Sequence, residues 1–334
     1  MMFFLLGLCI ILAVMLALNS IASFFASLLW KVLGPRARKW SSATQASVLC
    51  LLRTLPLVGG VTIVALLFAP AYLAHEPRDN HEEITFNLAV VAFFSALGIA
   101  LALVRGLVSW RATSRLTSDW LLHAEKIQLP GITIPSFRID HQFPVVAIVG
   151  TFRPRLFIAK KIFDSLTSEE LSAALAHEIG HVIARDNLKR GLIRACRDML
   201  LIIPCGRGLD IAWKEAAEGA ADEYAARGDR MVGLDLASAL VKIARLVPHG
   251  SRPTLPAGAY FVNQEDPSGF KSRVKNLVRL AGGGNSNPPA ALISKLPLWV
   301  PIAILVVLLG AISIESHVLV LTHAVIEHAV YLLS

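Results

Sequence analysis

Long apolar runs separated by short polar loops dominate the start of the chain. The first run, residues 3–30, contains no charged side chain, and it is longer than the roughly 20 residues that a helix needs to cross a bilayer. Comparable runs cover residues 54–74 and 85–104, and a fourth covers residues 296–314. We therefore expect a mainly α membrane protein with about four transmembrane helices, three near the start of the chain and one near its end.

Between the third and fourth runs the pattern changes. Residues 132–134, 145–149 and 155–159 are rich in β-branched side chains and are separated by proline and glycine, which is typical of short strands. We expect a small antiparallel sheet here, with residues 155–158 as the candidate for the edge strand that would hold a peptide; the alternative is that they form an ordinary core strand. Thr167 and Glu170 then form the pattern of a capping box before an Ala- and Leu-rich helix.

The chain divides accordingly into five parts. Residues 282–295 are rich in glycine, asparagine and proline, which is typical of a linker. The apolar tail that follows the fourth run would lie in the membrane interface, or would form the second half of a hairpin with that run. The expected parts are residues 1–110 with three transmembrane helices, 111–281 with one α+β domain, 282–295 with the linker, 296–315 with the fourth transmembrane helix, and 316–334 with the tail.

Composition and charge support an integral membrane protein. Hydrophobic residues make up 55% of the chain and the net charge is +8, a balance typical of apolar spans with basic flanks. The loop after the first run is rich in lysine and arginine, whereas loop 75–83 is acidic, and cytoplasmic loops collect basic residues. We therefore expect a protein of the bacterial inner (plasma) membrane whose domain 111–281 faces the cytoplasm. No nucleic-acid motif accompanies the positive charge, so the lipid bilayer is the expected partner.

His177, Glu178 and His181 carry the clearest chemistry in the chain. On a helix the spacing of four puts His177 and His181 on one face, where both imidazoles can bind one metal ion. Glu178 projects about 100° away from His177 around the helix, where it can reach a water on the metal without being a ligand. The pattern predicts one zinc ion per chain in a metallohydrolase, with Glu178 as general base.

A catalytic zinc ion keeps three protein ligands and one open position, so a third ligand is expected on a second element. The helix-forming segment 215–224 offers Glu218 and, four residues later on the same face, Asp222. Glu218 could bind the metal while Asp222 accepts a hydrogen bond from a ligating imidazole. An acidic, Ala-rich helix is more often a solvated surface helix, so the assignment depends on its pairing with His177 and His181.

Several motifs together resemble a known family of proteins. The motifs are Phe152-Arg153-Pro154-Arg155-Leu156, Ala174-Leu175-Ala176-His177-Glu178, Arg185-Asp186-Asn187-Leu188, Glu218-Gly219-Ala220-Ala221-Asp222 and Arg273-Val274-Lys275-Asn276-Leu277. They resemble the membrane-embedded zinc metallopeptidases of the beta-lactam sensor-transducer (BlaR/MecR-like) group, with the CAAX prenyl protease and heat-shock membrane protease family as cousins. The short interval from His181 to Glu218 favours the sensor-transducer branch.

The resemblance implies a fold, a ligand set and an activity. The domain would be of the zincin (gluzincin) type, with His177, His181 and Glu218 as ligands, Glu178 as base and Asp222 beside the ligands. Arg273 would stabilise the oxyanion or order the site. The implied activity is zinc-dependent endopeptidase cleavage of a protein or peptide substrate, and a regulatory membrane partner is left open. The alternatives are a catalytically silent, zinc-containing signal transducer or scaffold, and a channel with a coincidental motif.

Overall fold

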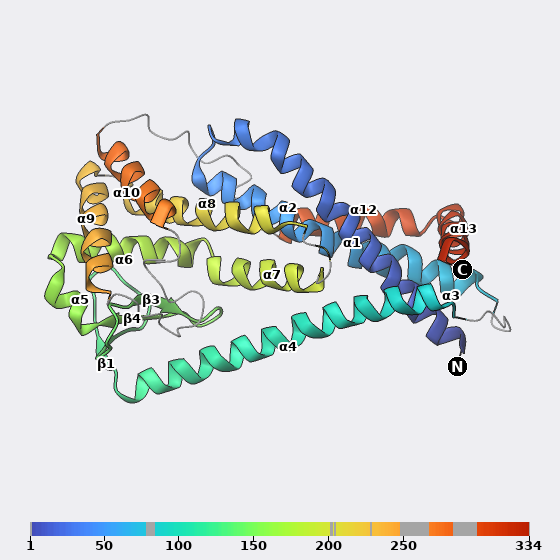
Figure 1. The fold of residues 1–334 in the computed structure, drawn as a ribbon, viewed down its shortest axis with the longest axis horizontal. Coiled ribbons are helices and arrows are strands. Elements are labelled where there is room, and N and C mark those ends of the chain that lie inside the picture. Colours follow the sequence, from blue (N-terminus) through green and yellow to red (C-terminus); the bar gives the residue numbers. More distant parts are fainter. Residues whose placement is uncertain are drawn as a thin grey trace.

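The computed structural model describes residues 2–77, 84–200, 203, 205–227, 229–247, 267–282 and 299–333. The described part is mainly helical and elongated (Figure 1), with the sheet and its covering helices at one end and both chain termini at the other. The predicted linker 282–295, apart from Gly282, lies outside the described residues. So does residue 296, the start of the predicted fourth span.

Among the described residues, three apolar helices are long enough to cross a membrane. They are α1 (Met2–Ala37), the stretch Ser42–His75, and α4 (Phe86–Leu122); the second consists of α2 (Ser42–Ile63), a π-helical turn (Val64–Phe68) and α3 (Ala69–His75). Large apolar side chains such as Phe4, Phe24 and Phe93 are exposed on these helices. An exposed apolar surface of this kind is what lipid covers, which confirms the prediction of membrane helices.

The fourth predicted span is α12 (Trp299–Ser313), which is only 15 residues long. It joins α13 (Ser316–Leu333) at a bend of 96°, and the described part of the chain contains a fourth crossing only if this bent pair counts as one. The bend puts α13 across the direction of α12 (Figure 1). The tail as an interfacial helix stays a prediction.

The strands predicted at 145–149 and 155–159 are present, but residues 132–134, also predicted as a strand, form none. The sheet in the described part of the chain has four strands. They are β1 (Glu125–Ile127), β2 (Ser136–Ile139), β3 (Val146–Val149) and β4 (Arg155–Ala159), in the order β1-β2-β4-β3. The sheet is mixed because β4 forms a hairpin with β3 and inserts next to β2, to which it runs parallel. β4 is therefore interior and the edge strands are β1 and β3. The prediction of residues 155–158 as the edge strand was wrong, and the alternative of an ordinary core strand holds.

Helices cover the sheet and complete the domain. They are α5 (Lys160–Ser165), α6 (Ser168–Ile183), α7 (Asp186–Met199), α8 (Arg207–Ala225), α9 (Arg230–Leu246) and α10 (Pro267–Ala281). The capping box of α6 is formed, with Thr167 and Glu170 bonding to each other's backbone amides. Buried side chains of β4 and α9, such as Phe157 and Leu240, share one apolar core with α6, and this burial fixes α6 against the sheet.

Helix α8 packs against the membrane helix α2, and a polar contact joins the two helices at each end of the packed region. Arg53, only 1% exposed, donates to Asp210 over 2.7 Å, and the hydroxyl of Ser42 donates to Glu223 over 2.5 Å. Gly219 lies between them, where an added Cβ would come within 2.9 Å of the Ser42 hydroxyl. The helix that carries Glu218 is therefore held directly on a membrane-spanning helix.

Candidate metal centre

Helices α6 and α8 bring the three predicted ligands together. The Nε2 atoms of His177 and His181 lie 3.2 Å apart, and the Oε2 atom of Glu218 lies 3.7 Å and 3.9 Å from them. Tetrahedral donors at zinc distances are separated by about 3.4 Å, so two imidazole nitrogens and one carboxylate oxygen at these spacings fit a zinc ion. Among the described residues, this is the group of histidine, cysteine and acidic side chains with metal-binding spacing.

The close approach of α6 and α8 depends on small residues. Gly180 lies between the two histidines, and a Cβ there would come within 3.2 Å of the Ala221 Cα atom. Ala221 is buried on the side of α8 that faces Gly180, and the Tyr224 ring lies next to it. Because the two backbones meet at a glycine and an alanine, the Glu218 carboxylate reaches the imidazoles.

Each imidazole has a carboxylate at its other nitrogen. His177 Nδ1 lies 2.9 Å from Asp222 Oδ1, and His181 Nδ1 lies 2.7 Å from Asp186 Oδ2. A ring that donates from Nδ1 to a carboxylate presents the lone pair of Nε2, and the carboxylate makes it a better ligand. The structure thus places Asp222 beside the His177 ring, and its role beside a metal ligand stays a prediction.

The contact between Asp186 and His181 was not predicted. Asp186 begins α7, immediately after Arg185, whose φ of 55° turns the chain sharply between α6 and α7. This turn brings a carboxylate five residues beyond His181 back to its ring. The motif Arg185-Asp186-Asn187 could have drawn attention to Asp186. The motif alone does not show the turn at Arg185, however, and so does not show which way Asp186 points.

Arg273 of α10 pairs with both carboxylates of α8. Its Nη2 and Nε atoms donate to the two oxygens of Asp222 over 2.7 Å and 2.9 Å, and Nη1 lies 3.1 Å from Glu218 Oε2. Such a two-pronged contact fixes the carboxylates and neutralises their charge. The geometry favours the predicted role of Arg273 in ordering the site over a role in stabilising an oxyanion.

Glu178 lies beside the ligands and is 7% exposed. Burial, the largest influence, raises its pKa to about 7, while the charge of His181 and the Ile148 amide that donates to it act in the opposite direction. Ile148 belongs to the edge strand β3, so the sheet holds this carboxylate in place. The result is a buried carboxylate next to three donors and outside the donor set.

The charges of the site stabilise one another. Burial alone would lower the pKa of His181, but Asp186 and Glu218 raise it to about 9. Burial dominates at His177 and lowers its pKa. Burial is the largest influence on Glu218 and Asp222 and opposes their ionisation, but Arg273 and His177 together outweigh it and lower the pKa of both carboxyls. The arrangement keeps Glu218 and Asp222 ionised. Glu218 needs its charge to bind a metal ion, and Asp222 needs its charge to accept the hydrogen bond from His177 Nδ1.

Comparison with known proteins points to the region that contains the candidate metal centre. Residues 142–250 match the sequence profile of peptidase family M48, a range that contains His177, His181, Glu218 and Asp222 but ends before Arg273. The chain is similar to proteins named "Protease HtpX homolog" from Janthinobacterium sp. (strain Marseille) and Herminiimonas arsenicoxydans, with 24% identity to each over 143 residues. Each alignment covers 40% of this chain and 49% or 48% of the relative, so the chain spans about half the length of the curated relatives it matches. No solved structure matches the chain.

The matches bear on both groups of the predicted resemblance. The sequence had favoured the sensor-transducer branch because of the interval between His181 and Glu218, but the matched relatives are named as protease HtpX homologues. That interval is largely the α7 region and the connection to α8, and connections vary in length more than the elements they join. The comparisons thus confirm the resemblance to metallopeptidases, at the level of peptidase family M48 and over residues 142–250.

Proposed function

We propose that this chain is an integral-membrane zinc metalloendopeptidase with Glu178 as its general base. The observation that carries the proposal is the cluster of His177, His181 and Glu218, with a buried carboxylate beside it that is not part of the donor set. A structural zinc site has four protein ligands and no use for a base. Three donors and a free carboxylate are the arrangement of a hydrolase.

The residues of the site divide the reaction between them. When bound, the zinc ion would activate a water and polarise the scissile carbonyl. Glu178 takes a proton from the attacking water and passes it to the leaving amine. The Ile148 amide and the apolar surroundings of α6 hold the Glu178 carboxylate for both steps. Asp222 orients the imidazole of His177 and Asp186 orients that of His181. Arg273 holds the carboxylates of Asp222 and Glu218 in place.

Edge strand β3 is the proposed support for a peptide substrate. Its outer edge faces Glu178, because the Ile148 amide donates to that carboxylate. Asn187 of α7 donates to the outward carbonyls of Ile148 and Gly150, over 3.2 Å each. An extended peptide would therefore pair with β3 on the Val146 side of these occupied groups, by main-chain hydrogen bonds.

Metal analysis tests the proposed centre. The detergent-purified full chain should contain one zinc ion per chain by inductively coupled plasma mass spectrometry, and His177→Ala should lose it because one of three donors is gone. His123→Ala is the matched control, since His123 is exposed at the end of α4 and far from the cluster in sequence. Absence of zinc from both the wild type and the control would remove the proposed centre.

We also propose that the peptidase domain faces the cytoplasm, on the basis of the basic loop after α1. A cysteine introduced by Lys39→Cys should react with a membrane-impermeant maleimide only after sealed cells are permeabilised. Asp79→Cys, in the acidic loop, should react without permeabilisation and so controls for labelling. The opposite pair of results would reverse the proposed orientation without affecting the proposed zinc site.

A further inference from the structure

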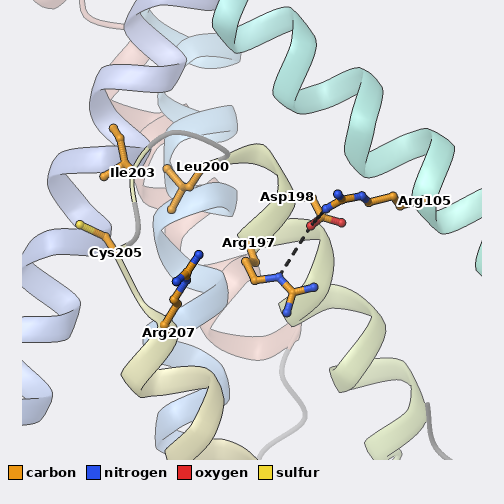
Figure 2. A pocket seen from close by; sticks show the side chains of 7 residues that line it. All are labelled: Arg105, Arg197, Asp198, Leu200, Ile203, Cys205 and Arg207. Carbon is orange, nitrogen blue, oxygen red and sulfur yellow. Dashed lines mark hydrogen bonds and ion pairs between the residues drawn. The ribbon is translucent and has the colours of Figure 1, made fainter.

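A second polar cluster lies away from the metal centre, between α4, the end of α7 and the start of α8. A pocket with about 170 Å³ of free volume is lined there by Arg105, Arg197, Asp198, Leu200, Ile203, Cys205 and Arg207. Figure 2 shows Arg105 reaching from α4 to Asp198, with Arg197 on the same helix as Asp198 and Arg207 at the start of α8. The proposed peptidase chemistry uses none of these side chains.

The pocket carries more positive than negative charge. Three guanidinium groups line it, but its single carboxylate, Asp198, is already shared between Arg105 at 2.8 Å and Arg197 at 3.7 Å. Arg207 has no carboxylate partner among the described residues. Like charges gathered around one pocket repel one another, so a bound anion would stabilise the cluster.

The start of α8 adds to this positive field. Arg207 is the first residue of α8, and Gly206 before it provides no side-chain cap. A helix begins with free amides and a partial positive charge, so a cation at that position is unfavourable and an anion is favoured. Behind Gly206 lies Arg53, which does not line the pocket and is paired with Asp210 of the first turn of α8, although its buried Nη2 atom has no hydrogen-bond partner. Arg207 and the first amides of α8 thus lie at the same end of the helix, beside the pocket.

The pocket also lies where a bilayer would end. Arg105 follows directly on the apolar run 85–104 of α4, and Leu103, Val104 and Leu107 around it are exposed. The end of α7 is held against the membrane part of α4, because a Cβ on Gly98 would come within 2.7 Å of the Met199 carbonyl oxygen. Arginines at the end of a membrane span, next to an exposed apolar surface, lie at the depth of the phospholipid headgroups.

We propose that this pocket binds the phosphate group of an anionic phospholipid. Arg207, Arg197 and the first amides of α8 would contact the phosphate, while Leu200, Ile203 and the exposed side chains of α4 would contact the acyl chains. An anionic lipid is favoured over a zwitterionic one because the lining has two more positive than negative groups. The site does not depend on the peptidase activity or on which side of the membrane the domain faces.

Lipid titration of the full chain in detergent, followed by native mass spectrometry, tests the proposal. Wild type should bind phosphatidylglycerol more tightly than phosphatidylcholine, and Arg207→Gln should weaken phosphatidylglycerol binding by about fivefold, as expected for one basic residue at a membrane surface. Arg115→Gln is the matched control, since Arg115 is exposed on α4 and does not line the pocket. Arg197→Gln, which removes a second lining guanidinium, should have an effect similar to that of Arg207→Gln.

The outcomes distinguish a phospholipid headgroup from free inorganic phosphate as the group that the pocket binds. Equal binding of the two lipids by wild type, or equal loss in Arg207→Gln and Arg115→Gln, would overturn the proposal. Binding of inorganic phosphate with no preference for phosphatidylglycerol would also overturn it, because the site would then take a soluble anion. A melting temperature for each variant shows that it is folded. The comparison of the two lipids on wild type decides the matter even if a variant does not fold.

Discussion

Replacing Glu178 by glutamine should leave the zinc content of the purified chain unchanged and reduce peptide hydrolysis by about 10²–10⁴-fold, the usual contribution of a general base. Glutamine has the same shape and its oxygen can still accept from the Ile148 amide that holds Glu178. It cannot take a proton from water. Metal content should persist because Glu178 is outside the group His177, His181 and Glu218.

Cleavage of a denatured, fluorescently labelled protein, measured beside zinc content, checks this result. Glu169→Gln is the matched control, since Glu169 is an exposed carboxylate on the same helix, α6. Full activity in Glu178→Gln would remove the base assignment. A wild-type chain that holds zinc but cleaves no tested protein would favour the alternative of a silent, zinc-containing signal transducer.

Local pattern was enough to predict the helices of the site. His177 and His181 lie on one helix, so their spacing alone determines that they share a face. Glu218 and Asp222 are related in the same way on α8, whereas the choice of Glu218 over the neighbouring acids depended on its pairing with His177 and His181 and on the resemblance to known metallopeptidases. The apolar runs likewise predicted α1, α2 with α3, and α4, because span length is set by bilayer thickness.

Contacts between distant segments could not be predicted in this way. The double contact of Arg273 with Asp222 and Glu218 joins α10 to α8, and the turn at Arg185 brings Asp186 to His181. The order of the strands escaped prediction for the same reason, since the sequence shows strands but not which of them pair. These features depend on packing, and packing is where sequence patterns carry the least information.

Removal of the Glu218 carboxylate should strongly weaken metal binding. Glu218→Ala takes away the one donor that α8 contributes, so zinc affinity should fall by more than the roughly 10–100-fold that follows loss of an outer carboxylate. Glu215→Ala, one helix turn earlier and exposed, should bind zinc as the wild type does. Competition with a chromogenic chelator measures both affinities on the folded chain.

The fold should tolerate Glu218→Ala, which makes the metal affinity interpretable. Arg273 keeps its two contacts with Asp222 when the Glu218 oxygen at 3.1 Å is lost, so the guanidinium is not left unpaired in a buried place. An unchanged melting temperature of the metal-free chain would show this. If Glu215→Ala lost zinc and Glu218→Ala kept it, the ligand would lie one turn away and the packing of α8 on α6 at Gly180 would have to differ. If neither variant lost zinc, a two-histidine site without α8 would replace the proposed centre.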